Sequence, residues 1–513
     1  MKKLIVFVIC LTVFSLLFTA CFKNSGDETT TDPTETTEET EASVQAVKES
    51  KIKLGYYKEK SLNPYLTDSP TNLMLSTLIY DSLFLPMENY TVEPLIADSY
   101  TYDGNRLIVT LKEDICFSDG SAISPYDIIY SFNQAKLSPA FSGRLSNIVS
   151  CEKGSTEIIF LLEGENIFAH NCLTFPILKS GIADDTLPVG SGRYTLSEKD
   201  GIYILTANES STRNEEMATK EIYLTEITSE KNELYLLQTG DLSYFFDDMT
   251  DGEYTKIVAN TSVVNLNNLV YLGCNYHTEE FYDINVLNAI SYAIDRYTII
   301  DTAYDSLARS TVLPFNPLWE ELSSVQTPST VQNITKAQEL LEESGYVFAY
   351  KNNKVRSKNM EYIELTLIVN NESEPKLICA RLIKEQLESI GIGINLKELT
   401  FEEYKNALNR GEYDLYVGET KLSADMSLHN FFTEGGSLGF GIDSMSTVAT
   451  AYNDFVGGKI DITTFIQVFE LQKPFIPICF RDAIAYYSRE LSYDDTVNEY
   501  EPFKNIYTWS VRG

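Results

Sequence analysis

The chain has 513 residues, 43% of them hydrophobic and 12% aromatic, which is enough to build two or three domains around separate cores. Its formal net charge of −34 argues against binding to nucleic acid and against direct adsorption to anionic lipid. We interpret the acidity as a solvated surface that aids solubility; the alternative is a negative field that favours cationic ligands.

Residues 1–21 have the arrangement of an export signal, with two lysines after the first Met and then an apolar run over residues 4–20. The run ends in Phe18-Thr19-Ala20-Cys21, which resembles the lipobox of bacterial lipoproteins, although that motif usually has Leu where this chain has Phe. The resemblance implies lipidation at Cys21, and a Cys that carries more than one acyl chain stays on the membrane. An uncleaved signal anchor is the alternative, since the run is at the lower limit of the roughly 17–25 residues that span a bilayer.

Residues 22–50 are dominated by Thr, Glu, Asp and Ser and have almost no large apolar side chains. Such a stretch buries too little surface to offset its ordering entropy, so we expect a disordered, self-repelling spacer. The spacer would hold the folded body away from the lipid headgroups.

The first half of the body has the pattern of an α+β region with an antiparallel sheet. Residues 106–111 and 157–162 have the composition of strands and are separated by the turn signals Ser118-Asp119-Gly120 and Lys153-Gly154-Ser155. A helix that begins near Pro125 lies between them.

The second half has the pattern of an α/β lobe with a mostly parallel sheet. A helix is predicted over residues 334–344, ended by a glycine. Residues 363–369 and 392–399 are predicted strands, and the apolar spacing between them predicts a helix that starts at Pro375 and ends at Gly391. Strand, helix and strand in this order form a βαβ unit with a right-handed crossover. A further helix over 401–410 and a strand over 413–417 follow.

Cysteine and histidine usage predicts no cofactor and no metal site. Eight Cys are present, one in the signal and one at the lipid site, and none of the others forms a C-x-x-C pair. Several body cysteines lie in apolar runs that suit buried thiols, so we expect no disulfide framework. The three His residues are far apart in the sequence, which leaves His-based catalysis without support.

Six ordered segments of the body resemble the oligopeptide- and dipeptide-binding family of bacterial ABC-importer solute-binding proteins (family 5 extracellular solute-binding proteins). The most specific is the segment over residues 111–131, where a strand, an Asp-Gly turn and a helix with an acidic residue at its start follow one another. The others are Leu62-Asn63-Pro64 with the segment 78–84, then Pro188-Val189-Gly190-Ser191-Gly192-Arg193-Tyr194, Gln238-Thr239-Gly240-Asp241, the segment 285–296 and the segment 337–346. At Asp127, Asp295 and Arg296 the side chains also suit helix capping and charge pairing, so we interpret these motif positions as structural.

The resemblance implies a two-lobed α/β clamshell of the type II periplasmic-binding-protein kind, with an extra α+β domain inserted in the first lobe. The expected boundaries are lobe 1 over 51–272 with the inserted subdomain at about 85–185, lobe 2 over 273–483, and a return to lobe 1 over 484–513. The family implies a monomer that binds a short peptide, delivers it to ABC transporter permease subunits, and works at the outer face of the cytoplasmic membrane.

A ligand crevice in an open α/β sheet lies beyond the carboxyl ends of the strands, so the strand over 413–417 places the following loop, residues 418–436, at the cleft. Its Leu422-Ser423-Ala424-Asp425 resembles the W-x-A-D segment in which the family's Asp takes the α-ammonium of the peptide. Asp425 is therefore the predicted ligand carboxylate, with Leu422 and Ser423 beside it; the alternative is an Asp that caps a helix beginning near Ser427. Leu422 stands where the family has Trp, so a stacking contact is lost.

Three other residues near the expected cleft have less specific signals. Asp68 follows the Asn-Pro loop of the first lobe and is a candidate second polar contact, with a solvated loop carboxylate as the alternative. Phe431 and Phe432 are interpreted as packing residues, with the lining of an apolar pocket as the alternative.

Capture of short peptides for import is the leading functional hypothesis. The same fold carries nickel chelates, sugars or haem in relatives, so another solute is an alternative, as is a surface peptide or pheromone sensor. An enzyme is not supported, because the chain has no G-x-S-x-G elbow, no H-E-x-x-H and no phosphate loop.

Overall fold

The computed structural model describes residues 51–182, 187–213, 215–249, 259–350, 353–444, 446–494 and 498–512. The predicted signal, the lipidation site Cys21 and the acidic spacer lie outside the described residues. Residues 49–513 form one compact unit, and the description that follows concerns this unit alone. Within the described ranges, no helix is long and apolar enough to cross a membrane.

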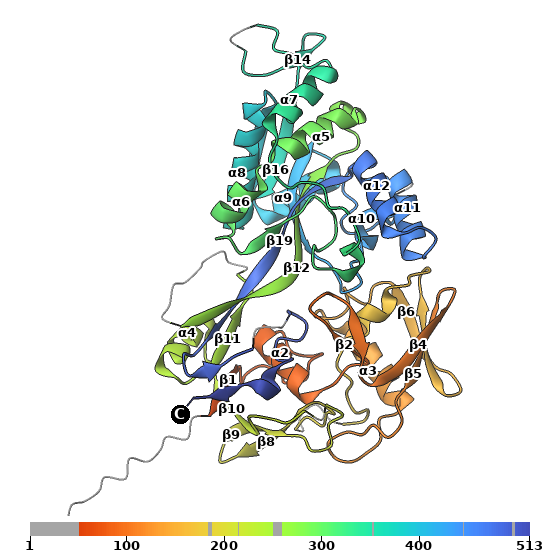
Figure 1. The fold of residues 1–513 in the computed structure, drawn as a ribbon, viewed down its shortest axis with the longest axis vertical. Helices are drawn as coiled ribbons and strands as arrows, with labels where there is room; N and C mark the ends of the chain where they lie inside the picture. Colours follow the sequence, from red (N-terminus) through yellow and green to blue (C-terminus); the bar gives the residue numbers. More distant parts are fainter. Residues whose placement is uncertain are drawn as a thin grey trace, which may run out of the picture. The chain divides into compact units, whose positions relative to one another are not determined.

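One large mixed sheet runs through the unit in the order β17-β16-β18-β12-β19-β11-β1-β10-β9-β8, with β13 paired to β19 at the side (Figure 1). Its strands are β1 (Ile52–Tyr56), β8 (Tyr194–Lys199), β9 (Ile202–Ala207), β10 (Glu221–Glu226), β11 (Tyr244–Asp247), β12 (Asn260–Cys274), β13 (Ala308–Ser310), β16 (Glu364–Asn370), β17 (Gly393–Leu399), β18 (Leu415–Lys421) and β19 (Phe475–Tyr487). We call β1 and β8–β11, with the elements that pack on them, the first lobe, and β16–β18 with their helices the second lobe.

Strands β12 and β19 connect the two lobes. Strand β19 pairs with first-lobe β11, strand β12 pairs with second-lobe β18, and β12 and β19 pair with each other. Figure 1 shows them as two long neighbouring strands that pass from β11 toward β16. Their antiparallel register is interrupted between Asn265 and Leu269, so residues 266–268 form a bulge. A bulge bends the strand, and because this one lies where β12 begins to pair with β18 of the second lobe, we call it the hinge bulge.

The βαβ unit predicted in the second half is confirmed. Strands β16 and β17 are parallel in register from Glu364↔Gly393 to Asn370↔Leu399, and α8 (Glu374–Ser389) connects them with a Pro in its first turn. The predicted helix over residues 401–410 is α9 (Phe401–Arg410), which has a Thr400/Glu403 capping box and ends at Gly411 in the left-handed region. The ends of these helices could be predicted from the sequence because capping residues next to each helix determine them.

The strands of this lobe are parallel, as predicted, because β16 pairs parallel with both β17 and β18. The connecting strands β12 and β19 join them in antiparallel pairing. The bounds of one predicted strand were wrong. The strand predicted over 413–417 is β18, which begins at Leu415 and continues to Lys421, so the loop after it starts at Leu422. The strand extends because residues 418–421 find ladder partners in β12, which lies more than 140 residues earlier in the chain.

The remaining helices of the second lobe pack around this sheet. They are α5 (Ile284–Ala293), α6 (Arg296–Ala303), α7 (Ile334–Glu343), α10 (His429–Phe432), α11 (Thr447–Val456) and α12 (Ile462–Gln472). Helix α7 matches the helix predicted over 334–344 to within one residue and is followed by Gly345 with a φ of 87°.

The α+β region predicted in the first half is confirmed. A four-stranded antiparallel sheet has the order β4-β5-β7-β6, with strands β4 (Ala97–Asp103), β5 (Arg106–Leu111), β6 (Ile148–Lys153) and β7 (Glu157–Leu162). Helix α3 (Pro125–Leu137) packs against β6 and begins with a capping box between Ser124 and Asp127. The smaller elements of the unit are α4 (Glu230–Thr239), β2 (Phe84–Pro86), β3 (Val92–Pro94), β14 (Ser357–Lys358), β15 (Glu361–Tyr362), β20 (Leu491–Ser492), β21 (Ser510–Val511) and four short 3₁₀ turns.

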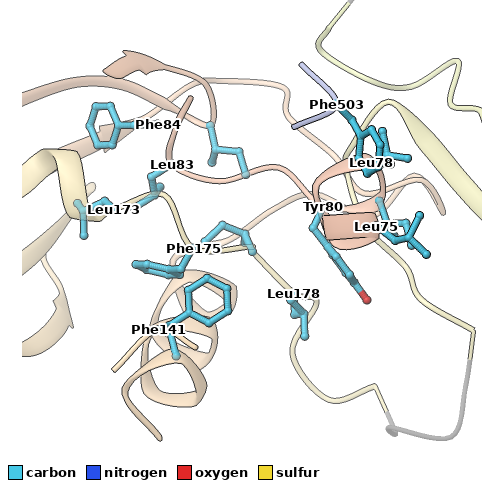
Figure 2. Packing of buried hydrophobic residues seen from close by; sticks show 14 of the residues in the cluster. Leu75, Leu78, Tyr80, Leu83, Phe84, Phe141, Leu173, Phe175, Leu178 and Phe503 are labelled. Carbon is cyan, nitrogen blue, oxygen red and sulfur yellow. The ribbon is translucent and has the colours of Figure 1, made fainter. Parts of the chain in front are cut away.

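The first-lobe core gathers around α2 (Pro70–Ile79), and Figure 2 shows ten labelled members of it, from Leu75 and Leu78 of α2 to Phe503 near the C-terminus. The motif Pro188-Val189-Gly190-Ser191-Gly192 closes against the end of this helix. A Cβ on Gly190 would lie 1.9 Å from the carbonyl oxygen of Ile79, so only glycine lets the two backbones approach this closely. The motif is therefore a packing device.

Candidate functional site

Two cavities of similar size open in the described part of the chain. One, of about 310 Å³, is lined by first-lobe elements alone, among them β1, β9 and the segment 178–189. The other, of about 290 Å³, is lined by residues of both lobes and of the hinge. A site that uses lobe closure needs contacts on both sides, so we take the second, hereafter the interlobe cavity, as the candidate site.

The interlobe cavity is built from segments that are far apart in the chain. Helix α2, the hinge bulge of β12, the end of β18 and the C-terminal return all contribute to its lining. The lining residues include Leu73, Met74, Phe141, Arg144, Thr174, Leu266, Asn268, Lys421, Glu499 and Tyr500. The lining combines apolar and aromatic surface with a few charged groups, as is typical of small-molecule sites.

Asn267 in the hinge bulge positions the segment that carries the predicted ligand carboxylate. Its side chain is fully buried, and its amide donates to the carbonyls of Leu422 and Ser423, at 3.1 Å each. Its backbone carbonyl accepts from the Leu422 N–H at 2.9 Å, and its own N–H donates to Glu499 at 2.7 Å. Hydrogen bonds from the hinge bulge therefore hold the start of the loop in place.

Asp425 is buried, and its carboxylate is hydrogen-bonded to both lobes. From the first lobe, Asn166 donates to its Oδ2 at 3.1 Å and Asn147 donates to the same oxygen at 3.4 Å. From its own loop, the Ser423 hydroxyl and the Ser427 backbone N–H, the latter at 3.3 Å, donate to Oδ1. These donors are all neutral, so the carboxylate has hydrogen bonds and no counter-ion among the described residues.

The electrostatics of Asp425 follow from this environment. Burial raises the pKa of the carboxyl, and the hydrogen bonds from Ser423, Asn166 and the Cys172 thiol oppose the rise. Neutral donors offset part of the desolvation cost of a buried carboxylate, and a cation would offset more. The alternative, a helix cap, is not what the structure shows, because α10 begins at His429 and its cap is Leu428.

Asp425 is not among the residues that line the interlobe cavity, but its neighbours connect it to the lining. Thr174 lines the cavity and is two residues from Cys172, which contacts the carboxylate. On the other side, Lys421 lines the cavity four residues before Asp425, and the Tyr500 hydroxyl donates to the Leu422 carbonyl at 3.1 Å.

The neighbouring predicted residues have different surroundings. Ser423 is half-buried and directs its hydroxyl at Asp425. Leu422 is 3% exposed and packs in a buried cluster that includes Phe431, Phe432 and Phe475. Phe431 and Phe432 pack in this cluster, as predicted; Phe431 stacks on Phe475 with ring centroids 4.6 Å apart.

Asp68 lies on the surface and is not among the residues that line the interlobe cavity. Its side chain is 72% exposed and pairs with Lys60 at 2.8 Å, and this hydrogen bond lowers the pKa of its carboxyl. Its contact with ligand stays a prediction.

Three of the motif positions serve the scaffold, as predicted from the sequence. Asp127 closes the capping box of α3 and also accepts from the Ser180 N–H at 2.8 Å. Asp295 caps α6 through the Thr298 N–H. Arg296 is buried and donates to the carbonyls of Thr311, Pro477 and Ser291, which are polar groups of the second-lobe core.

The cysteines and histidines form no site in the described part of the chain. Cys116, Cys151, Cys172, Cys274, Cys379 and Cys479 are free thiols. Across the same residues, no group of three or more His, Cys, Asp or Glu side chains is placed to hold a metal ion.

Sequence reasoning missed Asn147, Asn166, Asn267 and Arg144. A signal existed for Asn267, since two adjacent Asn residues interrupt an otherwise apolar strand and so mark an irregularity. For the other three no local signal exists, because their roles arise from contacts with residues more than 250 positions away.

Comparison with known proteins decides the family. The model of the bacterial extracellular solute-binding proteins, family 5 (middle region), matches residues 91–438, well over half of the chain. The chain belongs to this family. The resemblance found in the sequence is thereby confirmed, and the mixed α/β unit with its large sheet is a two-lobed type II clamshell.

Relatives of this family 5 protein are named for different ligands. The oligopeptide-binding protein AppA of Bacillus subtilis is 24% identical over 377 residues, which cover 68% of this chain and 69% of AppA. The nickel-binding protein NikA of Staphylococcus aureus is 22% identical over 367 residues, which cover 67% and 68%. Among solved structures, the unliganded open form of the periplasmic murein tripeptide binding protein MppA is similar in fold, with a TM-score of 0.73 at 16% identity over 90% of this chain and 97% of MppA.

Membership of family 5 establishes the general activity. These proteins bind solutes for ABC transporters, they act outside the cytoplasm or in association with the membrane, and they are not enzymes. The absence of enzyme motifs in the sequence agrees with this assignment.

Proposed function

We propose that this family 5 protein captures short peptides that have a free α-amino group and delivers them to the permease of an ABC importer. The observation that carries the proposal is Asp425, a buried carboxylate with no counter-ion among the described residues, which lies four positions after Lys421 of the cavity lining. An ammonium removed from water regains its hydration energy through charge-assisted hydrogen bonds, and a buried carboxylate is the group that supplies them.

Ligand capture then uses an exchange of donors at Asp425. In the structure the Oδ2 position is filled by the amides of Asn147 and Asn166 from the first lobe. A ligand ammonium replaces these neutral donors with a charged one and lowers the pKa that burial has raised. The protein closes around ligand because the closed state makes these contacts and the open state does not.

The size of the cavity favours a short ligand. Its volume of about 290 Å³ is at the low end of the roughly 300–1,000 Å³ found for small-molecule sites. Peptide main chain would be held by backbone groups at the end of β18, with its side chains in hydrated pockets.

A different solute is the alternative, and two observations favour it. Relatives include a nickel-binding protein, and Leu422 replaces the Trp of peptide-binding members with a side chain that is packed away from the cavity. A surface peptide sensor would use the same cavity and pass its signal to another protein.

Native mass spectrometry of residues 51–513 purified from cells tests the proposal. We expect masses of a mixture of short peptides that leave on unfolding, and a much smaller peptide load on the Asp425→Asn variant. A bound sugar or metal chelate in place of peptides would contradict it.

We further propose that lipid on Cys21 tethers the protein close to its permease. The support is the lipobox-like end of an apolar, positively started segment, followed by an acidic spacer. A tether raises the effective concentration of the binding protein at its permease without any new contact. Metabolic labelling with a tagged fatty acid tests this: the full chain is expected to take up label and Cys21→Ser to lose it, and equal labelling of both would contradict the assignment.

A further inference from the structure

The first-lobe cavity has no part in the proposed function. Its volume is about 310 Å³, and among the described residues it shares no lining side chain with the interlobe cavity. Its lining includes four tyrosines and two aliphatic side chains, which are Tyr56, Tyr80, Tyr130, Tyr203, Leu62 and Val189. Tyr56 and Tyr203 meet edge to face, with ring centroids 5.4 Å apart. Such a lining suits an aromatic ring, because aromatic pairs attract each other beyond the area that they bury.

The lining of this cavity reverses the charge balance of the chain. Lys58, Lys60 and Lys179 line it, with Glu198 as the single acidic residue of the described lining. The whole chain, by contrast, has 74 acidic and 40 basic side chains. Lysines that gather at one cavity of an acidic protein give it a local positive potential, which attracts anions.

Lys58 is the lysine that is available to a ligand. Lys60 pairs with Asp68 at 2.8 Å, and Lys179 pairs with Asp119 at 2.5 Å. Within the described ranges, no carboxylate lies within ion-pair distance of the Lys58 ammonium. Ion pairs between partly exposed groups contribute little to stability, so the two paired lysines can also exchange their partners for a ligand anion at small cost.

Hydrogen bonds hold the walls of the cavity in place. The Asn72 side chain is fully buried beside the turn that carries Lys58; its amide donates to the Tyr57 carbonyl at 2.9 Å, and its Oδ1 accepts the Tyr57 N–H at 2.8 Å. Leu178, which also lines the cavity, donates its backbone N–H to the Ser131 hydroxyl at 2.8 Å. A cavity whose walls are fixed before the ligand arrives loses less entropy on binding.

We propose that the first-lobe cavity is a second binding site, which takes a small aromatic carboxylate with its ring among the tyrosines and its carboxylate at Lys58. The inference goes beyond peptide capture and does not depend on it, because the two cavities have separate linings. The volume is at the low end of the roughly 300–1,000 Å³ of small-molecule sites, which favours a ligand with a single ring. A monoanion fits better than a phosphate dianion, because Glu198 in the lining repels a second negative charge.

Ligand-observed NMR and isothermal titration calorimetry on residues 51–513 test the site. The probes are phenylacetate, its neutral analogue phenylacetamide, and acetate. We expect the wild-type protein to bind phenylacetate roughly three- to tenfold more tightly than phenylacetamide, the effect of one or two ion pairs that stay partly exposed. Acetate should bind at least about tenfold more weakly than phenylacetate, because it has no ring to bury.

Lys58→Gln should bind phenylacetate and phenylacetamide with affinities within about twofold of each other, because the ion pair is gone. Lys354→Gln is the matched control, since Lys354 is also exposed and has no ion pair among the described residues. This control should keep the wild-type preference. Tyr203→Leu should weaken both ring probes alike, because it removes an aromatic contact and no charge.

Asp425→Asn and a pool of mixed-sequence tripeptides separate the two cavities. Neither is expected to change the binding of phenylacetate. Weaker binding in Asp425→Asn, or displacement of phenylacetate by the tripeptides, would place this ligand in the interlobe cavity and overturn the inference.

Three further results would overturn the second site and leave peptide capture standing. They are equal binding of phenylacetate and phenylacetamide by the wild type, a preference for the acid that survives in Lys58→Gln, and no binding of either ring probe at millimolar concentration.

Discussion

The substitution Asp425→Asn tests the ligand site with the least change in shape. The carboxylate accepts hydrogen bonds from first-lobe amides at Oδ2 and from its own loop at Oδ1, and the Cys172 thiol contacts it as well. Asparagine keeps the acceptor at Oδ1 and turns Oδ2 into a donor that faces Asn147 and Asn166. The charge is lost while the volume is retained.

The stability of the ligand-free protein is expected to change little. Asn147 can rotate its amide at no loss, since its Oδ1 has no hydrogen-bond partner in the described part of the chain. Asn166 is less free, because its Oδ1 accepts the Phe168 N–H at 2.9 Å. One lost hydrogen bond costs about 1 kcal/mol, and removal of a charge that burial disfavours offsets part of this cost. We expect the unfolding free energy to stay within about 1 kcal/mol of wild type.

Ligand affinity is expected to change much more. A hydrogen bond to a charged group contributes about 1.5–3 kcal/mol, so its loss weakens binding of an amine-bearing peptide roughly ten- to a hundredfold. Isothermal titration with a pool of mixed-sequence tripeptides and with its N-acetylated form measures the effect. Acetylation should weaken wild-type binding by a similar factor and leave the variant almost unaffected, because both changes remove the same charge pair.

Asp454→Asn is the control for this series, since Asp454 lies on α11 in the same lobe and pairs at 3.7 Å with an exposed Lys459. Wild-type affinity for free peptides in Asp425→Asn, or equal affinity of the wild type for free and acetylated peptides, would refute the assignment of the ammonium site.

Two further predictions concern buried charges outside the cavity. Arg213 lies 3.0 Å from Asp81 and 3.1 Å from Glu501, with all three side chains at most 7% exposed, so Arg213→Gln should lower the unfolding free energy by about 3–5 kcal/mol in urea; a loss below about 1 kcal/mol would show that the ion pairs are not needed. Burial raises the pKa of Asp482 from 3.8 to about 6, so the folded state holds this proton more tightly than the unfolded chain does. The stability it contributes is present below pH 4 and lost as the pH rises through about 6, by about 3 kcal/mol at 1.36 kcal/mol per pH unit; Asp482→Asn should remove this dependence, and the same pH dependence in both proteins would contradict the prediction.

Much of the local structure was predictable because its causes are local. The bounds of α9 follow from a Thr-x-x-Glu capping box and a terminal glycine, and those of β5 and β7 from apolar alternation between turn signals. The family also was recognisable from ordered motifs, although motif residues such as Asp127 and Arg296 hold the scaffold together and do not reach the cavity.

The sequence by itself determined the signal-like start, the acidic spacer, the helices and strands with their own caps and turns, the family, and Asp425 as the candidate carboxylate. Tertiary structure decided the rest. The antiparallel pairing of β18 with β12, the hinge bulge that holds Leu422, and the two asparagines that fill the Asp425 site all join segments more than 140 residues apart. Contacts between segments so far apart depend on the packing of the two lobes, and a local sequence pattern does not predict that packing.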